Sequence, residues 1–394
     1  MRHKPTLNYS GLTVILENQS RFDNCELISG YAGHLFQGAL GIPRQACDIR
    51  LLNTLGEGFL PDTKVILLLG QKALSTFKNA FIGEQRGCPW VAHNRTYIAT
   101  FAPQDAIDRK AYFNPLSNET EMDYETVRHG KTKRSNWRFW FLRDVAKAAQ
   151  YLKVPPRPES GDLITYPKEQ EILDLLTNTK GQEMFFDIET NKHLEMTCFG
   201  FSFGPDKGWC VPMLQVNHYY YDNTHKVLRA LAVALRDNTV IIHNALFDLF
   251  VIAYRYGIPA PTKVFDTMLS HHRLFPEVEK SLGHCISLYT DQPYHKNEGC
   301  FNPHTSSEFQ RLYEYNIKDV LTMALIKPTL DSLSETLRAE KSIEQVNSMV
   351  KPYLTAMLQG MHIDTPELRM ITMYNERYQY QLRRILGLLL GREL

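Results

Sequence analysis

Four acidic side chains, set in three short segments, constrain the fold of this chain more than any other feature of its sequence. They are Asp187 and Glu189 in FFDIET, Asp248 in HNALFD, and Asp319 in YNIKD. Each segment adjoins an apolar run that would bury it, and burying a carboxylate without a counter-charge is costly. A shared cation resolves that cost, so we expect segments separated by gaps of about sixty and seventy residues to meet at one point.

Local patterns predict how each segment presents its acid. FFDIET is typical of a buried strand, in which period-two alternation places Asp187 and Glu189 on one face. TVIIHN is β-branched and then turns helical, which puts Asp248 near a helix N-terminus, the favourable end for an anion. LYEYNIKDVLTMALI has helical spacing, so Tyr315 and Asp319, four residues apart, share a face.

Each segment also has an ordinary explanation. Asp-x-Glu on a strand is commonly a solvated edge or a turn, and Asn-x-x-x-Asp is commonly a helix N-cap followed by an exposed acid. Tyr-x-x-x-Asp is ordinary helix surface. The ordered coincidence of all three segments, each beside an apolar element, favours a metal site instead.

The chemistry that such a site suits is phosphodiester hydrolysis. This reaction needs an activated water, an in-line geometry and compensation for charge on the leaving oxygen, and two divalent ions about 3.5–4 Å apart supply all three. Mg²⁺ and Mn²⁺ prefer carboxylate oxygens and retain bound waters. The sequence therefore predicts a nuclease with two divalent metal ions, Mg²⁺ or Mn²⁺, as cofactors.

The same residues resemble the DEDD superfamily of 3′-5′ exonucleases, in the subgroup with a tyrosine in its third motif (DEDDy). The resemblance runs from about Tyr166 to Glu335, and KVFDTMLSHHRLFPEVEKSLGHCISLYTDQPYHK is similar to the stretch between the second and third motifs of phage family A DNA polymerases. It implies an α/β, RNase H-like domain with a mixed sheet over residues 167–335. The implied function is proofreading in DNA replication, on single-stranded 3′ ends of primer-template DNA.

The resemblance also implies a role for each catalytic residue. Asp187 would bridge both metals, Glu189 and Asp319 would complete the shell of the first metal, and Asp248 would serve the second. Tyr315 would orient the attacking water.

Four further residues take supporting roles from the resemblance. Thr190, Asn244 and Phe247 would contact the terminal nucleotide. Asp266 in FDTML would support the metal ligands from behind. An N-cap to the following helix explains Asp266 equally well.

Residues 1–152 alternate strand and helix patterns and resemble the α/β fold of uracil-DNA glycosylases. AGHLFQGALGIPR, KVILLLGQKALSTF, a GCPW turn and TYIATFAPQDAI carry this resemblance. The catalytic signatures differ, because LENQSRFDNCE replaces the glycine-rich motif with its water-activating acid, and Ala102-Pro103-Gln104 replaces the His-Pro motif. The four cysteines of an iron–sulfur cluster are also absent. Without these groups glycosidic cleavage loses electrostatic support, so we expect a non-catalytic domain used for binding or architecture.

Two segments lie next to the expected boundary of that domain. Proline and glycine cluster in YLKVPPRPESGDLITYP, which predicts a linker over residues 153–166. Upstream, RHGKTKRSNWRFWFLR at residues 128–143 mixes basic and aromatic side chains, a composition suited to phosphate contact and base stacking. The alternative is a helix whose aromatic side chains pack inward, and we favour it for the aromatic residues while leaving the charges open.

Residues 336–394 have a long helical pattern, and LQGMHIDTPEL resembles the junction at which family A polymerases enter the thumb. The sequence contains no palm with catalytic aspartates and no fingers. We therefore expect no polymerase activity from this chain alone. Either a separate palm-and-fingers chain is its partner, or the sequence is part of a longer protein.

The cysteine content and the apolar runs of the sequence indicate in which cellular compartment the protein works. Seven cysteines without a Cys-x-x-Cys pair argue against a disulfide framework and for a reducing environment. The longest apolar runs have only strand length, and no secretory segment is recognisable. We expect a soluble, cytoplasmic protein with no membrane partner, in the host cytoplasm if the gene belongs to a phage. The net charge of +1 is a poor guide, because an acidic site offsets basic surface elsewhere.

Three other functions remain open at this stage. The chain could be an assembly subunit of a split DNA polymerase with little nuclease activity of its own, which affinity for a palm-containing partner would reveal. It could recognise lesions through the glycosylase-like domain, which uracil release would reveal. It could instead digest RNA, as RNase D does, because a single sequence does not show how a 2′-hydroxyl is received.

Overall fold

A computed structural model describes residues 11–17, 36–42, 46–56, 59, 62–103, 137–158, 161–215, 218–219 and 221–391. The chain forms two compact units, Met1–Lys351 and Pro352–Leu394. Most of the segment around LENQSRFDNCE, and residues 128–136 of the basic aromatic segment, lie outside the described residues.

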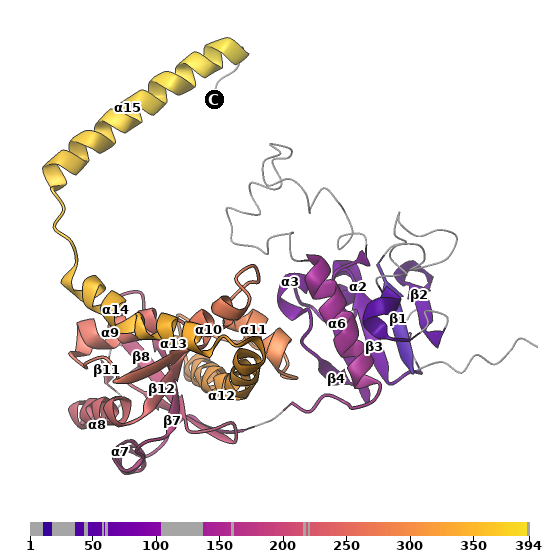
Figure 1. Cartoon of the computed structure of the whole chain (residues 1–394), viewed down its shortest axis with the longest axis horizontal. Helices are drawn as coiled ribbons and strands as arrows, with labels where there is room; N and C mark the ends of the chain where they lie inside the picture. The colour runs from indigo at the N-terminus through magenta and orange to yellow at the C-terminus, as the bar shows by residue number, and fades with distance from the viewer. Residues whose placement is uncertain are drawn as a thin grey trace, which may run out of the picture. The chain divides into compact units, whose positions relative to one another are not determined.

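The first unit begins with a five-stranded sheet of order β2-β1-β3-β5-β4 (Figure 1). Its strands are β1 (Leu12–Leu16), β2 (Asp48–Leu51), β3 (Val65–Leu69), β4 (Trp90–Ala92) and β5 (Arg95–Thr100). All neighbouring pairs are parallel except β4 with β5. β1 and β3 are buried along their whole length, as expected for apolar parallel strands covered on both faces.

Helices cover this first sheet. They are α2 (Gln71–Phe77), α3 (Ile82–Gln85) and α6 (Trp137–Tyr151), with a short 3₁₀ turn, η2, at Leu52–Thr54. In α6, Phe141 and Val145 pack against β1 and β3, and Trp140 is also fully buried. Phe139 stays 39% exposed. The inward packing that we favoured for the aromatic residues therefore holds for two of the three described side chains.

The second sheet has six strands of order β13-β12-β7-β8-β9-β6. They are β6 (Asp162–Ile164), β7 (Glu183–Thr190), β8 (Met196–Ser202), β9 (Lys207–Pro212), β12 (Thr239–Ile242) and β13 (Lys263–Asp266), beside a separate pair, β10 (Leu214–Gln215) and β11 (His218–Tyr219). β8 runs antiparallel to both of its neighbours, β7 and β9, whereas β12 is parallel to β7 and to β13. The sheet is mixed, as expected from the sequence.

β6 lies inside the segment that we predicted as a linker. It pairs in parallel with β9 and closes one edge of the second sheet. A cluster of proline and glycine predicted the irregular backbone before it but not the three-residue strand, because pairing with β9 is a tertiary contact. The domain boundaries themselves stay predictions.

Helices of the second sheet region carry Asp248, Tyr315 and Asp319. The helices of this region are α7 (Glu169–Asn178), α8 (Thr224–Asp237), α9 (Ala245–Tyr256), α10 (Thr267–Leu274), α11 (Leu282–Tyr289), α12 (Ser306–Leu337) and α13 (Glu340–Ser348). α12 begins with a capping box between Thr305 and Glu308. The apolar side chains of Ile317 and Leu321 on α12 pack in one cluster with Cys198 of β8 and Cys210 of β9.

Two glycines let α12 approach the sheet closely. A Cβ at Gly208 would lie 2.5 Å from Ile317 Cγ2, and a Cβ at Gly200 would overlap the side chain of Asn316. Real Cβ atoms do not tolerate such contacts. The strands β8 and β9 therefore hold α12 at a separation that larger residues would not permit.

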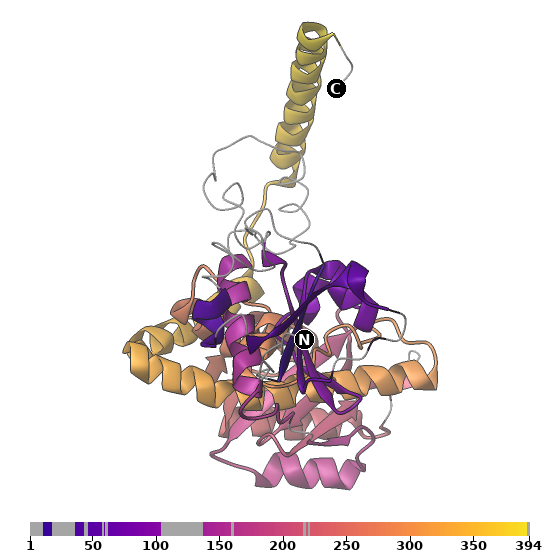
Figure 2. The same cartoon turned by 90° about the vertical axis from the view of Figure 1, so that its right-hand side faces the viewer.

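From residue 336 to residue 391, the last one described, the chain is mostly helical, as expected from the sequence. After α13 come α14 (Val350–Gln359) and α15 (Thr365–Leu390), and Asp364 caps α15 by accepting from Glu367 N–H. Both views show α15 as one unbroken helix (Figure 1 and Figure 2). Among the described residues, no helix combines the length and the apolar character needed to cross a membrane.

Candidate active site

Three of the four predicted acids meet at the second sheet. Asp187 and Glu189 come from β7, and Asp319 comes from α12, which packs on that strand. One carboxylate oxygen of each residue lies within 4.8 Å of the others, and we call these three residues the acidic cluster. The prediction that Asp187 and Glu189 share a face and approach the third motif is consistent with this geometry.

Asp248 joins the acidic cluster from the first turn of α9. Its side chain is buried, and Oδ1 accepts a hydrogen bond of 3.0 Å from the N–H of Ile188. Ile188 separates Asp187 from Glu189 on β7, so this contact places Asp248 against the same strand. The expected helix N-terminus is also present, with Asn244 as the N-cap in a left-handed conformation.

Hydrogen bonds fix the orientation of the cluster. Asn316, three residues before Asp319 on α12, donates from Nδ2 to Asp187 Oδ2 at 2.7 Å. This bond joins α12 to β7 directly at the acids. Asn316 was not predicted as a site residue, although its position next to Tyr315 in the third motif could have suggested it.

Two basic side chains, His295 and Lys296, contact the carboxylate of Asp319. His295 Nε2 lies 2.8 Å from Asp319 Oδ1, and the ammonium of Lys296 forms an ion pair with Asp319 Oδ2. The same ammonium lies over the Tyr315 ring, 4.2 Å from its centroid. Sequence reasoning missed both residues. The adjacent His-Lys pair in the loop before α12 was the available signal, since buried acids require nearby positive charge.

The electrostatics of the acids differ according to these contacts. Burial, and after it the negative charge of Asp319, raise the pKa of Asp187 to about 7. Burial also raises the pKa of Glu189 and of Asp248, with Asp187 adding to the effect. Burial alone would raise the pKa of Asp319, but Lys296 and His295 hold it below its usual range. Carboxylates packed together in this way gain stability from any bound cation.

Tyr315 is buried one helical turn before Asp319, as expected. Its ring meets those of His295 and Phe301 edge-on, with centroids 6.0 and 5.3 Å apart. Burial, followed by the charge of Asp319, raises the pKa of the phenol. The hydroxyl therefore stays protonated and can act as a hydrogen-bond donor beside the acidic cluster.

The three residues expected at the terminal nucleotide lie at the ends of the same elements. Thr190 ends β7 at an irregularity of its pairing with β8. Asn244 and Phe247 form the exposed start of α9, where the Phe247 side chain is 42% exposed. Contact of these residues with a nucleotide remains a prediction.

Asp266 forms the helix N-cap that its sequence context allowed, and its support of metal ligands remains a prediction. Its carboxylate caps α10 by accepting from the N–H groups of Met268 and Leu269. It also accepts from the N–H groups of Asn244 and Ala245, at 3.2 and 2.8 Å. One buried carboxylate thus ties the N-termini of α9 and α10 together and supports the helix that carries Asp248.

Comparison with known proteins agrees with this geometry. Residues 167–335 match the sequence model of a family described as 3′-5′ exonuclease. This segment is therefore similar to 3′-5′ exonuclease domains. No curated protein matches the chain.

Solved structures with a similar arrangement include several nucleases. Brucella melitensis NrnC with bound Mg²⁺ is 21% identical, with a TM-score of 0.39 over 51% of this chain and 98% of that chain. Escherichia coli RNase D is 14% identical, with a TM-score of 0.39 over 49% and 50%. The catalytic core of RRP6 from Trypanosoma brucei is 13% identical, with a TM-score of 0.38 over 49% and 54%. None of these likenesses assigns a substrate to this chain.

Proposed function

We propose that the 3′-5′ exonuclease domain removes nucleotides from single-stranded DNA 3′ ends by hydrolysis with two divalent metal ions. The observation that carries this proposal is the acidic cluster, in which Asp187, Glu189 and Asp319 converge within 4.8 Å. Asp248 adds a fourth carboxylate through its bond to Ile188 on the same strand.

The donor set suits hard divalent cations. All four side chains offer carboxylate oxygens, which Mg²⁺ and Mn²⁺ prefer, and the raised pKa of Asp187, Glu189 and Asp248 shows that burial leaves them short of positive charge. In our proposal Asp187, Glu189 and Asp319 would hold one ion, and Asp187 and Asp248 would hold the other. Bound ions would supply an activated water and neutralise charge on the leaving oxygen.

The surrounding residues supply orientation. The protonated Tyr315 hydroxyl, beside Asp319, donates to the attacking water. The exposed Phe247 ring stacks on the terminal base, and Asn244 and Thr190 contact its sugar and phosphate. Stacking on an aromatic ring tolerates every base, which suits a nuclease that digests any 3′ end.

A proofreading role in a phage-type family A polymerase extends this proposal. Its support is the resemblance of residues 263–296 to the corresponding stretch of those enzymes, and the helical residues 336–394. In this role a palm-and-fingers portion, on the same or another chain, supplies polymerisation, and the exonuclease receives primer ends from it.

The test is digestion of a 5′-labelled single-stranded DNA oligonucleotide, and of an RNA of the same sequence, with Mg²⁺ or Mn²⁺. The wild type is compared with Asp187→Asn. Asp237→Asn, at the end of α8 and paired with Arg236, is the matched control outside the site. A ladder shortening from the 3′ end of DNA, lost in Asp187→Asn and kept in Asp237→Asn, supports the proposal.

Two other outcomes would change the proposed function. Faster digestion of RNA than of DNA would replace the proofreading role with RNA turnover. A well-folded wild type that digests neither substrate with either ion would overturn independent nuclease activity and favour an assembly subunit of a polymerase.

A further inference from the structure

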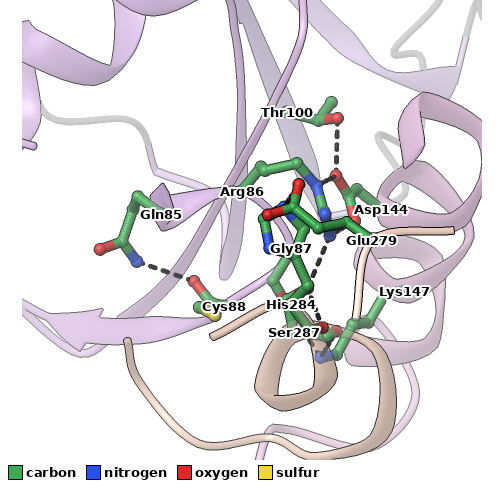
Figure 3. Close-up of polar contacts among 10 residues, drawn as sticks. All are labelled: Gln85, Arg86, Gly87, Cys88, Thr100, Asp144, Lys147, Glu279, His284 and Ser287. Atoms are coloured by element: carbon green, nitrogen blue, oxygen red, sulfur yellow. Dashed lines mark hydrogen bonds and ion pairs between the residues drawn. The ribbon is translucent and has the colours of Figure 1, made fainter. Parts of the chain in front are cut away.

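A buried polar network joins α6 and the first sheet region to α11, an eight-residue helix of the second sheet region (Figure 3). Arg86 and Asp144 form an ion pair of 3.0 Å with side chains 1% and 0% exposed. Thr100 Oγ1 donates to the same carboxylate at 2.7 Å, and the guanidinium lies 3.7 Å from the Trp140 ring centroid. Every charge in this network therefore has a close partner.

The network reaches α11 through the hydroxyl group of Ser287 and through backbone carbonyl groups at the end of that helix. Arg86 Nη2 donates to Ser287 Oγ at 2.7 Å. Lys147 Nζ donates to the carbonyl oxygens of Gly87, Ser287 and Thr290, at 2.9, 2.9 and 2.6 Å. Burial lowers the pKa of Lys147 to about 8, and the ammonium form therefore still predominates at neutral pH.

These contacts cap the C-terminus of α11. The last carbonyl groups of a helix have no partner within the helix, and cations nearby are favoured by the helix dipole. In α11 the carbonyl of Ser287 accepts from Lys147 and that of Leu288 accepts from Arg143, at 3.1 Å. Two side chains of α6 thus cap the C-terminus of α11.

The start of α11 contacts Tyr294 and Lys296, in the loop that follows this helix. A Cβ at Gly283 would lie 3.0 Å from Tyr294 Cε2 and 3.4 Å from Lys296 Cγ. Lys296 is the residue whose ammonium pairs with Asp319. The position of α11 therefore limits where Lys296 can lie.

The loop that leads from α11 to Lys296 is held at both ends. At its beginning, Asp291 accepts from the Tyr151 hydroxyl of α6 at 2.7 Å. At its end, His295 and Lys296 contact the carboxylate of Asp319. Six residues, 291–296, thus span from α6 to the acidic cluster.

We infer that Lys147 is a positioning residue for the exonuclease site, which acts by capping α11 and so holding the loop 291–296 with His295 and Lys296 against Asp319. In this arrangement the region before residue 152 is a support for the catalytic site. The inference deepens the proposed function and rests on it wherever nuclease rates are the readout.

The first experiment measures hydrogen–deuterium exchange in the full chain and needs no activity. Lys147→Met removes the ammonium and keeps most of the aliphatic stem, and Ser287→Ala removes only the hydroxyl that accepts from Arg86. Lys153→Met, at an exposed position just after α6, is the matched control. We expect faster exchange over residues 282–296 in Lys147→Met, a smaller increase in Ser287→Ala, and no change in the control, with exchange in β7 and β8 unaltered.

Two exchange results would overturn the inference. Unchanged exchange over residues 290–296 in both variants would show that α6 does not hold the loop. Faster exchange throughout β7 and β8 in Ser287→Ala as well as in Lys147→Met would show that the network supports the whole fold and not this loop.

The second experiment is a double-mutant cycle on digestion of single-stranded DNA. We expect Lys147→Met to lower kcat about tenfold, with KM unchanged, because small misplacements of a catalytic group have effects of this size. In the Lys296→Met background the same change should lower kcat less than about twofold, because the two residues act through one contact. Equal losses in both backgrounds would overturn the inference. A wild type without nuclease activity would overturn the proposed function, whereas the exchange experiment would still decide the coupling.

Discussion

The two sheet regions bury charge in opposite ways. In the first, the carboxylate of Asp144 meets Arg86 and Thr100, and every charge of the network has a protein partner. In the second, four carboxylates converge, and among the described residues Lys296 is the ammonium that pairs with one of them, Asp319. The comparison teaches that a balanced buried charge serves architecture, whereas an unbalanced set of like charges suits the cations that we propose for this site.

The largest expected effect comes from removing one carboxylate charge from the acidic cluster of the second sheet region. Asp187→Asn should lower the exonuclease rate by about a thousandfold or more, because the residue is proposed to hold both ions. The thermal stability of the metal-free protein should stay the same or rise, since an uncompensated charge is removed. Rates of single-stranded DNA digestion and calorimetry measure the two effects. A large loss of stability in Asp187→Asn would break the comparison.

Removing a carboxylate charge from the first sheet region should instead lower the stability of the fold. Asp144→Asn leaves the buried guanidinium of Arg86 without its counter-charge, which costs about 3–5 kcal/mol of unfolding free energy. Urea unfolding followed by tryptophan fluorescence suits this test, because Trp140 contacts Arg86. Asp237→Asn, which loses a solvent-exposed pair with Arg236, is the control and should show no measurable change. A neutral Asp144→Asn would contradict the assignment of this network to architecture.

A smaller effect is expected from Asp266, whose carboxylate serves two helix N-termini. Asp266→Ala should cost about 1–2 kcal/mol, the usual range for the loss of a helix cap. Because α9 carries Asp248, the variant should also weaken stabilisation by Mg²⁺, measured as the rise in Tm on addition of the ion. Asp364→Ala removes a comparable cap from α15 and should leave that Mg²⁺ effect unchanged.

The smallest effect is a dependence of ion binding on pH. The pKa of Asp187 is raised to about 7 in the folded protein from an ordinary value of 3.8, so between these values the folded state holds a proton that the unfolded state releases. The metal-free fold therefore loses this contribution to stability as pH rises through the window. A divalent ion replaces the proton, so Mg²⁺ should raise Tm by a few degrees at pH 8 and by less at pH 5.5. A larger rise at pH 5.5 would contradict this linkage.

The sequence predicted the elements of the site better than their contacts. Period-two alternation in FFDIET was enough to place Asp187 and Glu189 together, and helical spacing was enough for Tyr315 and Asp319. The contact of Asp248 with the Ile188 N–H depends on how α9 meets β7, which no local pattern encodes. For the same reason Asn316 was missed, since its bond to Asp187 depends on the register of α12 over the sheet.

Long-range packing accounts for the other gaps. Lys296 pairs with Asp319 from the loop that follows α11, and the end of α11 contacts Lys147, more than a hundred positions earlier in the chain. The short strand β6 likewise forms only because β9 is beside it. The resemblance of residues 1–152 to uracil-DNA glycosylases remains a prediction, and most of the segment that replaces the glycine-rich motif lies outside the described residues.

The close approach of α12 to Gly200 has a practical consequence for anyone who needs an inactive form of this chain. A methyl group at that position would collide with Asn316, the residue that links α12 to Asp187. Gly200→Ala should therefore lower the proposed exonuclease activity, because it moves the acids apart while leaving each of them in the sequence. A survey for intact catalytic motifs would score such a variant as functional, so spacing as well as motif identity decides whether a relative of this chain can cut.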